Sequence, residues 1–174
     1  MRDAIDRKQI EAVWRQRAGR LSQRPALAGA GQAGAPVIVL GLGKNRYGIN
    51  LPDVAEVLAP VRPTAVPGAP SIFSGVINVH GEIRPVIDLK RWLGIESPPS
   101  RDLVRVILLR RKGRELGLQV DSVEQIRWIG PEDLQPAGNG NLGSDKQIQG
   151  TTKDMLRLLN TEGLFDELQT GVIT

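Results

Sequence analysis

From residue 36 onward, the chain alternates short apolar runs with turn signals. Pairs of β-prone runs joined by a few polar or glycine residues predict hairpins over residues 37–51, 75–89 and 103–120. Further strands are expected at 124–129 and 155–159. Many short strands at this spacing favour barrels or a sandwich over a parallel α/β sheet, and the sequence therefore predicts a mostly β fold.

Two short helices interrupt the predicted strands. The first spans Asp88–Gly94, with an aspartate to cap its start and a glycine to end it. The second spans Asn160–Leu168, where asparagine occupies the capping position and acidic residues lie near the favourable end of the helix dipole. Each helix directly follows a predicted strand.

The first 35 residues differ from the rest of the chain. Residues 3–22 predict a helix with apolar positions near one face, and an Ala/Gly/Pro-rich stretch after it predicts a flexible linker. The apolar positions are Ile10, Val13, Trp14 and Leu21. Two interpretations stay open: a solvated, partly frayed leader, or a helix that binds a partner or a membrane surface.

An internal repeat is the most informative pattern. Shifted by 69 residues, 37–57 aligns without gaps on 106–126. The identical positions are Val37, Ile38, Leu40, Gly48 and Val54, which match Val106, Ile107, Leu109, Gly117 and Val123. The repeat predicts two similar subdomains, about 36–90 and 103–160, which share a hydrophobic seam because each is too small to bury enough surface alone. The alternative is chance similarity between two β-hairpins.

Composition narrows the classes of protein to consider. Forty per cent of the 174 residues are hydrophobic, and there is no cysteine, which excludes a disulfide framework, a cysteine zinc site and a thiol nucleophile. The start is charged throughout, without an apolar signal peptide, and no apolar run approaches the roughly 20 residues of a membrane helix. We therefore expect a soluble, cytoplasmic protein that does not insert into membranes.

The net charge of +4 at first suggests a nucleic-acid partner. All of this excess lies in residues 1–35, and the remaining chain is neutral, which is a poor electrostatic match for a phosphate backbone. The one basic cluster of the body, residues 110–114, lies at a hairpin tip and is expected to be solvated. We expect no nucleic-acid partner; a small β-barrel module that binds single-stranded nucleic acid or another unrelated partner remains the alternative function.

The sequence offers little catalytic chemistry. Residues 29–34 match a dinucleotide-binding glycine pattern, but no strand precedes them and no helix follows. His80 is the single histidine, and at a hairpin tip it is expected to be a turn residue. Glu132 and Asp133 are expected to complement backbone N–H groups. We therefore predict that the protein is not an enzyme and has no catalytic residues, cofactor or metal.

Several spaced motifs resemble the CheW-like domain family. Residues 46–58 contain its YGI-type strand and V-x-E-[IV] segment, and residues 66–94 contain a P-x-x-P segment, a G-V-x-N-[LV]-x-G turn and a P-[IV]-[IV]-D-[LI] junction. Residues 103–138 are similar to the V-D-x-V and x-P-E-x-[IL]-x-P elements. The resemblance covers about residues 36–168, leaving a leader and linker at 1–35 and a tail at 169–174.

The resemblance implies a fold and a function. The expected fold is two small five-stranded barrels, SH3-like or OB-like, packed on each other. The expected function is a non-catalytic adaptor in chemotaxis or a related two-component pathway. It joins the cytoplasmic tip of a methyl-accepting chemoreceptor to the regulatory domain of a CheA-like histidine kinase. Such a protein is expected to be a monomer alone and arrayed in complex, through pseudo-equivalent barrel edges.

The family motifs also imply an interaction surface, in a groove between the barrels. Motif by motif, it falls on Val54, Glu56, Gly75, Asn78 and Gly81. The alternatives are ordinary core for Val54 and turn geometry for Gly75 and Gly81.

His80 is a departure from the family pattern, which usually has arginine there, and it completes the candidate interaction residues. Arginine could pair with the glutamate at the position of Glu56, and histidine keeps a hydrogen bond possible but lacks the planar fork of donors. We hypothesise that receptor or kinase affinity falls as the pH rises through the range in which His80 loses its proton.

Overall fold

A computed structural model describes residues 34–96, 103–136 and 146–170 of the chain. The predicted helix at 3–22 lies outside these residues, and so do most of the linker and of the tail. The description below concerns the described residues alone.

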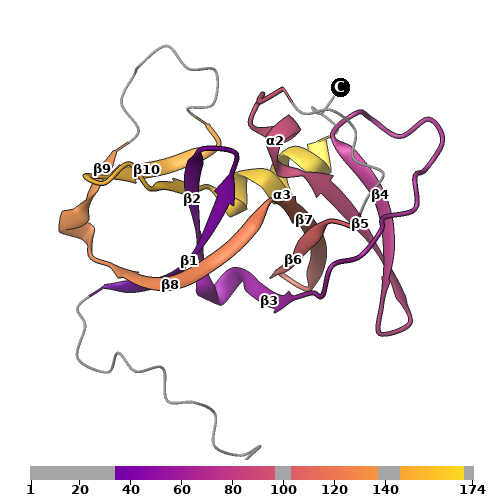
Figure 1. Cartoon of the computed structure of the whole chain (residues 1–174), viewed down its shortest axis with the longest axis horizontal. Helices are drawn as coiled ribbons and strands as arrows, with labels where there is room; N and C mark the ends of the chain where they lie inside the picture. Colours follow the sequence, from indigo (N-terminus) through magenta and orange to yellow (C-terminus); the bar gives the residue numbers. More distant parts are fainter. Residues whose placement is uncertain (1–33, 97–102, 137–145, 171–174) are drawn as a thin grey trace, which may run out of the picture. The chain divides into compact units, whose positions relative to one another are not determined.

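The described chain forms two antiparallel-rich sheets and two short helices (Figure 1). The six-stranded sheet has the order β8-β1-β2-β11-β10-β9, and the five-stranded sheet has the order β3-β6-β7-β5-β4. The first sheet comprises β1 (Ala35–Leu42), β2 (Asn45–Asn50), β8 (Ser122–Ile129), β9 (Leu134–Pro136), β10 (Ile148–Thr152) and β11 (Arg157–Leu159). The second comprises β3 (Val54–Val57), β4 (Phe73–Val79), β5 (Glu82–Asp88), β6 (Arg105–Arg111) and β7 (Arg114–Val120). The mostly β prediction is confirmed, with one strand more in the first sheet than expected.

The three predicted hairpins are present, and so are the two short helices predicted after strands. β1–β2, β4–β5 and β6–β7 are antiparallel hairpins. Helix α2 (Leu89–Trp92) begins after Asp88, whose carboxylate accepts hydrogen bonds from the backbone N–H groups of Lys90 and Arg91. Helix α3 (Thr161–Thr170) begins after Asn160, whose Oδ1 accepts from the N–H of Gly163. These contacts satisfy N–H groups that a helix start leaves without partners.

The two sheets do not follow the two halves of the sequence. β1–β2–β3 and β6–β7–β8 are the two copies of the repeat, and each copy gives its third strand to the other: β3 pairs with β6, and β8 pairs with β1. Two parallel pairs also join the two parts of the sequence: β11 pairs with β2, and β5 pairs with β7. Each sheet therefore draws strands from both 36–90 and 103–160, and the boundary between the sheets is not a boundary in the sequence.

The first strand of each repeat is buried on both faces. Ile38 and Leu40 of β1 join a core shared by the two sheets, whereas Val37 and Val39 join a smaller cluster within the six-stranded sheet. β6 behaves in the same way, with Ile107 and Leu109 in the shared core and Val106 and Leu108 in a cluster of the five-stranded sheet. Because neighbouring strand residues point to opposite faces, burial on both sides explains these unbroken apolar runs. The shared core is the hydrophobic seam that the repeat predicted.

Two aspartates hold the exchanged strands by matching contacts. Asp53, just before β3, accepts from Arg111 Nη1 at 3.0 Å and from the Thr161 hydroxyl at 2.6 Å. Asp121, just before β8, accepts from the backbone N–H of Gly43 at 2.7 Å and pairs with Lys90 Nζ at 2.7 Å. Each aspartate thus binds the hairpin tip of the other repeat and the helix that follows that repeat.

This exchange predicts that neither half folds alone. A chain cut between residues 99 and 100 should give two fragments that lack cooperative unfolding separately, because each would expose one face of β1 or β6. Mixed together, the fragments should regain the dispersed amide NMR spectrum of the intact protein. A single fragment with its own cooperative thermal transition would contradict the proposed interdependence.

Candidate interaction site at one end of the five-stranded sheet

The β4–β5 hairpin ends in a two-residue turn that presents His80. His80 and Gly81 both have a positive φ, 51° and 89°, and the Asn78 side chain accepts a hydrogen bond from the Gly81 N–H at 2.8 Å. Such turns match the twist of the strands that they join. The prediction that His80 is a hairpin-tip residue is confirmed, and Asn78 and Gly81 shape the turn that carries it.

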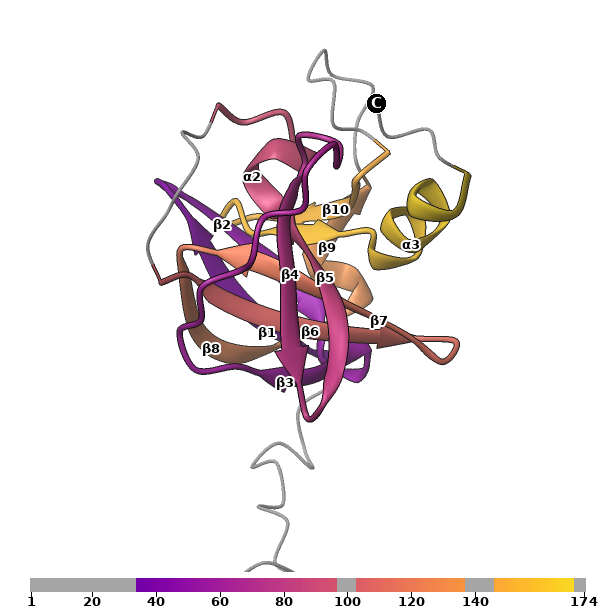
Figure 2. The same ribbon diagram turned by 90° about the vertical axis from the view of Figure 1, so that its right-hand side faces the viewer.

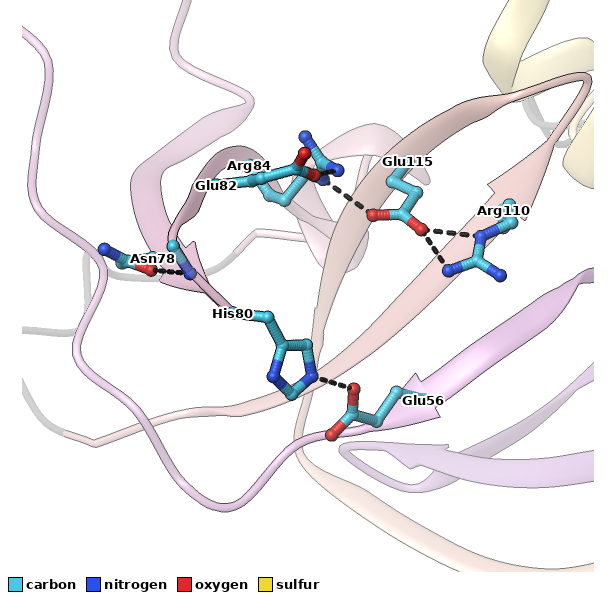
Figure 3. Close-up of polar contacts among 8 residues, drawn as sticks. Glu56, Asn78, His80, Glu82, Arg84, Arg110 and Glu115 are labelled. Atoms are coloured by element: carbon cyan, nitrogen blue, oxygen red, sulfur yellow. Dashed lines mark hydrogen bonds and ion pairs between the residues drawn. The ribbon is translucent and has the colours of Figure 1, made fainter.

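His80 contacts Glu56 across the sheet. Its Nε2 lies 2.9 Å from Glu56 Oε2. Figure 3 shows the two side chains pointing toward each other. Glu56 belongs to β3, which is one edge of the five-stranded sheet, and His80 follows β4, which is the other edge. The pair therefore bridges the two edges. Both side chains stay accessible, at 77% and 43% exposure, so the contact adds little stability and its polar atoms face solvent.

Beside this pair, the same sheet carries a row of fixed charges. Glu115 on β7 accepts from Arg84 Nε at 2.7 Å and from Arg110 Nε at 2.6 Å, and Arg84 also pairs with Glu82 (Figure 3). The hydrogen bonds from Arg84 and Arg110 hold the pKa of Glu115 below its usual value. The hydrogen bond to Glu115 raises the pKa of Arg84. These groups thus keep their charges over the whole neutral pH range.

The basic cluster at 110–114 is solvated at Arg110 and Lys112, as predicted, with side chains 63% and 66% exposed, but its charges are also paired with acids. Arg110 pairs with Glu115, and Arg111 pairs with Asp53 and Glu162 at 3.0 Å each. The hydrogen bond from Arg111 lowers the pKa of Glu162. Glu115 directly follows the cluster, whereas Asp53 and Glu162 come from the turn before β3 and from α3, which the local sequence does not reveal.

Two of the candidate residues lie within the fold instead of on its surface. Val54 is partly buried and packs against the shared core. Gly75 is buried with φ 139°, and a Cβ there would lie 2.2 Å from the carbonyl oxygen of Thr64, whose backbone pairs with Val76. Val54 thus fits the core alternative, whereas Gly75 lies in strand β4 and not in a turn, and its missing side chain lets the backbone of Thr64 approach closely. The structure brings together Glu56, Asn78, His80 and Gly81.

Exposed apolar side chains flank the polar pair, and the sequence analysis did not select them. Val57 follows Glu56 on β3 and is 46% exposed, and Ile83 stands opposite Asn78 in the β4–β5 ladder and is 62% exposed. Exposed apolar residues beside accessible polar groups are typical of protein interfaces. Their sequence context resembles that of buried strand residues, so only the structure distinguishes them.

The six-stranded sheet has a comparable bridge between an edge strand and a turn. Arg127 on β8 lies 2.5 Å from Asp154 in the β10–β11 turn, and the Thr152 hydroxyl donates to the other Asp154 oxygen at 2.6 Å. The hydrogen bonds from Thr152 and Arg127 lower the pKa of Asp154 to about 2. The charge order is reversed relative to His80–Glu56, since here the acid is on the turn.

The described residues hold no group of three or more histidine and acidic side chains that could bind a metal ion. Within the same part of the chain, none of the helices has the length and apolar character needed to cross a bilayer.

Comparison with known proteins assigns the family. The model of the CheW-like domain matches residues 36–169. The chain belongs to the CheW-like family. Its CheW-like domain includes every strand of both sheets except the first residue of β1, and also the His80–Glu56 pair.

Named relatives agree with this assignment. A probable chemotaxis protein CheW of Rhizobium etli is 30% identical over 83% of this chain and 96% of its own length. A chemotaxis protein CheW of Bacillus subtilis is 29% identical over 74% of this chain and 83% of its own length. The crystal structure of scaffolding protein TtCheW from Thermoanaerobacter tengcongensis superimposes with a TM-score of 0.65 and 30% identity, covering 73% of this chain and 89% of that one.

The family assignment confirms several predictions from the sequence. The resemblance to CheW-like proteins was correct, and so was the mostly β fold in two parts. The chain is a non-catalytic signalling adaptor of the chemotaxis type, not an enzyme, because it belongs to a family of such adaptors.

The contacts of Gly75 and Gly81 predict different costs for the same substitution. Gly75→Ala should lower the free energy of unfolding by about 3 kcal/mol, because it combines a clash with Thr64 and a strained positive φ. Gly81→Ala should cost only about 1 kcal/mol, since its positive φ is the single penalty and the space around it is open. Urea unfolding of both variants measures the difference, and equal costs would contradict the assigned role of Gly75.

Proposed function

We propose that this chain couples the cytoplasmic tips of methyl-accepting chemoreceptors to the regulatory domain of a CheA-like histidine kinase, as a cytoplasmic scaffold. The observation that carries the proposal is the match of a CheW-like domain to residues 36–169, together with relatives named chemotaxis protein CheW and a structural neighbour described as a scaffolding protein. In this proposal, the accessible pair of His80 and Glu56 at one end of the five-stranded sheet supplies a contact surface.

In this proposal, His80 and Glu56 make direct contacts with a partner. Both are exposed, and each has a second polar atom beyond the shared hydrogen bond. Asn78 and Gly81 hold the turn, while Val54 and Gly75 fix β3 and β4 against the rest of the sheet. The six residues then act as one unit, in which two bind and four set the position of the binding pair.

The edge strands support an arrayed assembly. β3 and β8 are the third strands of the two repeats, and each lies at an edge of its sheet. Val57 on β3 and Ile126 on β8 occupy matching repeat positions and are 46% and 44% exposed. A protein with two such edges can contact two neighbours of similar fold, which is the arrangement expected with a kinase regulatory domain that itself resembles CheW-like domains.

A direct test is binding of the full-length protein to the regulatory domain of a CheA-like kinase from the same source, by isothermal titration calorimetry. Glu56→Ala should weaken binding about tenfold, because it removes a contact and the partner that orients His80. The matched control is Glu132→Ala, an exposed acid next to the six-stranded sheet.

Wild-type levels of binding by Glu56→Ala would exclude this pair from the kinase contact, and the same titration against a receptor-tip peptide would then test the other partner. Failure of wild-type protein to bind either partner would overturn the coupling function itself.

The histidine in place of the family's arginine predicts a pH dependence. Protonated His80 forms an ion pair with Glu56, whereas neutral His80 keeps only a hydrogen bond, so affinity for the partner should fall between about pH 5.5 and 8. His80→Arg should bind with nearly constant affinity over this range, because arginine stays charged. Wild-type affinity that is flat over the same range would remove the hypothesis.

A further inference from the structure

The six-stranded sheet contains a cavity at one end. Its volume is about 500 Å³. All six strands contribute to the wall, through Ile129, Val37, Asn50, Leu158, Gln149 and Leu134 in the order of the sheet. In Figure 1, the strands of this sheet lie in the left part of the view. Cavities at the mouths of β-barrels, with volumes of about 300–1,000 Å³, are common ligand sites.

The chemistry of the wall selects a class of ligand. Among the described residues that line the cavity none is charged, and most of the surface they give it is aliphatic. The two polar side chains are the carboxamides of Asn50 and Gln149. Asn50 stands at the N-cap position of the 3₁₀ turn Leu51–Asp53 but makes no capping hydrogen bond with its side chain. Each carboxamide offers one acceptor and a pair of donor hydrogens, which suits a neutral polar group.

The five-stranded sheet provides an internal comparison. The repeat places Asn50 on Gln119, and β10 and β4 carry the same bulge, which places Gln149 on Ser74. In the five-stranded sheet these two side chains satisfy each other, because the Ser74 hydroxyl donates to Gln119 Oε1 at 2.7 Å. In the six-stranded sheet the matching carboxamides line the cavity instead.

The apolar part of the site shows the same difference. Ala35 lines the cavity, and the repeat places it on Val104, which is buried in the apolar cluster of the five-stranded sheet. Leu58 and Val61 pack against that cluster from the β3–β4 connection. The five-stranded sheet therefore fills this space with its own side chains, whereas the six-stranded sheet leaves it open. Because the two sheets share the same arrangement of five strands, that arrangement alone does not explain the cavity.

We propose that this cavity binds a small, uncharged organic molecule with an apolar body and one hydrogen-bonding head, such as an amide, carbonyl or hydroxyl group. The aliphatic wall covers the body, and Asn50 and Gln149 bind the head. Neither Glu56 nor His80 lines the cavity, so this site is separate from the candidate interaction site. Binding of a small molecule here would be an activity in addition to the proposed coupling function.

The test uses the neutral fluorescent probe N-phenyl-1-naphthylamine, which has an apolar body and a single N–H group, with the full-length protein. Fluorescence should rise and saturate at one probe per chain. Ala35→Phe fills the cavity and should abolish the saturable signal, and Asn50→Leu should weaken it about fivefold. Ala55→Phe, which changes an exposed strand alanine of the other sheet, is the matched control and should bind like wild type.

A second measurement keeps the test independent of how well Ala35→Phe folds. In methyl NMR spectra of the wild-type protein, the probe should shift the signals of Val37, Leu134 and Leu158, which line the cavity, and leave those of Val57 and Ile83 unchanged. Non-saturable fluorescence, or shifts centred on Val57 and Ile83, would overturn the proposal. Saturable binding that survives Ala35→Phe in a folded variant would overturn it as well.

Discussion

The burial of β1 and β6 on both faces is the constraint on which the rest of the structure depends. Each strand needs one apolar layer from the shared core and a second from the cluster of its own sheet. A fully buried Val, Leu or Ile side chain contributes about 1.5–3 kcal/mol relative to exposure, so leaving either face uncovered would cost more than a small domain can lose. The chain covers both faces by exchanging β3 and β8 between the repeats.

The exchange also determines where partners can bind. β3 and β8 become edge strands because each pairs on one side only, with β6 or with β1. The candidate interaction site shows the dependence clearly: Glu56 and His80 both come from residues 36–90, yet Glu56 is held in place by pairing with Leu108 of the second repeat. Figure 2 shows β4 and β5 in front of the strands of this sheet, with their turn at the far end from α2. The site is thus a property of both repeats together.

Local and periodic features of the fold were predictable from the sequence. The hairpins, the Asp88 and Asn160 caps and the turn position of His80 depend on residues close in the chain, and the repeat required only a comparison of the chain with itself. Strands β3, β9 and β10 were not predicted. They are short and mostly polar or exposed, so pairing to a neighbour defines them and an apolar pattern does not.

Contacts between distant residues mark the limit of the sequence analysis. The pairing of Glu56 with His80 was anticipated only through the family resemblance, and the neutralisation of Arg111 by Asp53 and Glu162 was missed. The role of Gly75 depends on Thr64, which has no motif that links it to the glycine. In each case the decisive partner comes from another element, and its position follows from the sheet topology.

The exchanged third strands also bear on how such a chain could arise. A single repeat built to this plan would leave an unpaired strand edge and an uncovered apolar face, and a second copy covers both by offering the same two elements in return. The present architecture is therefore that of a strand-swapped dimer joined into one polypeptide. In such an arrangement, the two repeats can differ from each other at positions that the shared core does not use. The five-stranded sheet pairs Ser74 with Gln119, whereas at the matching positions of the six-stranded sheet Asn50 and Gln149 line the cavity.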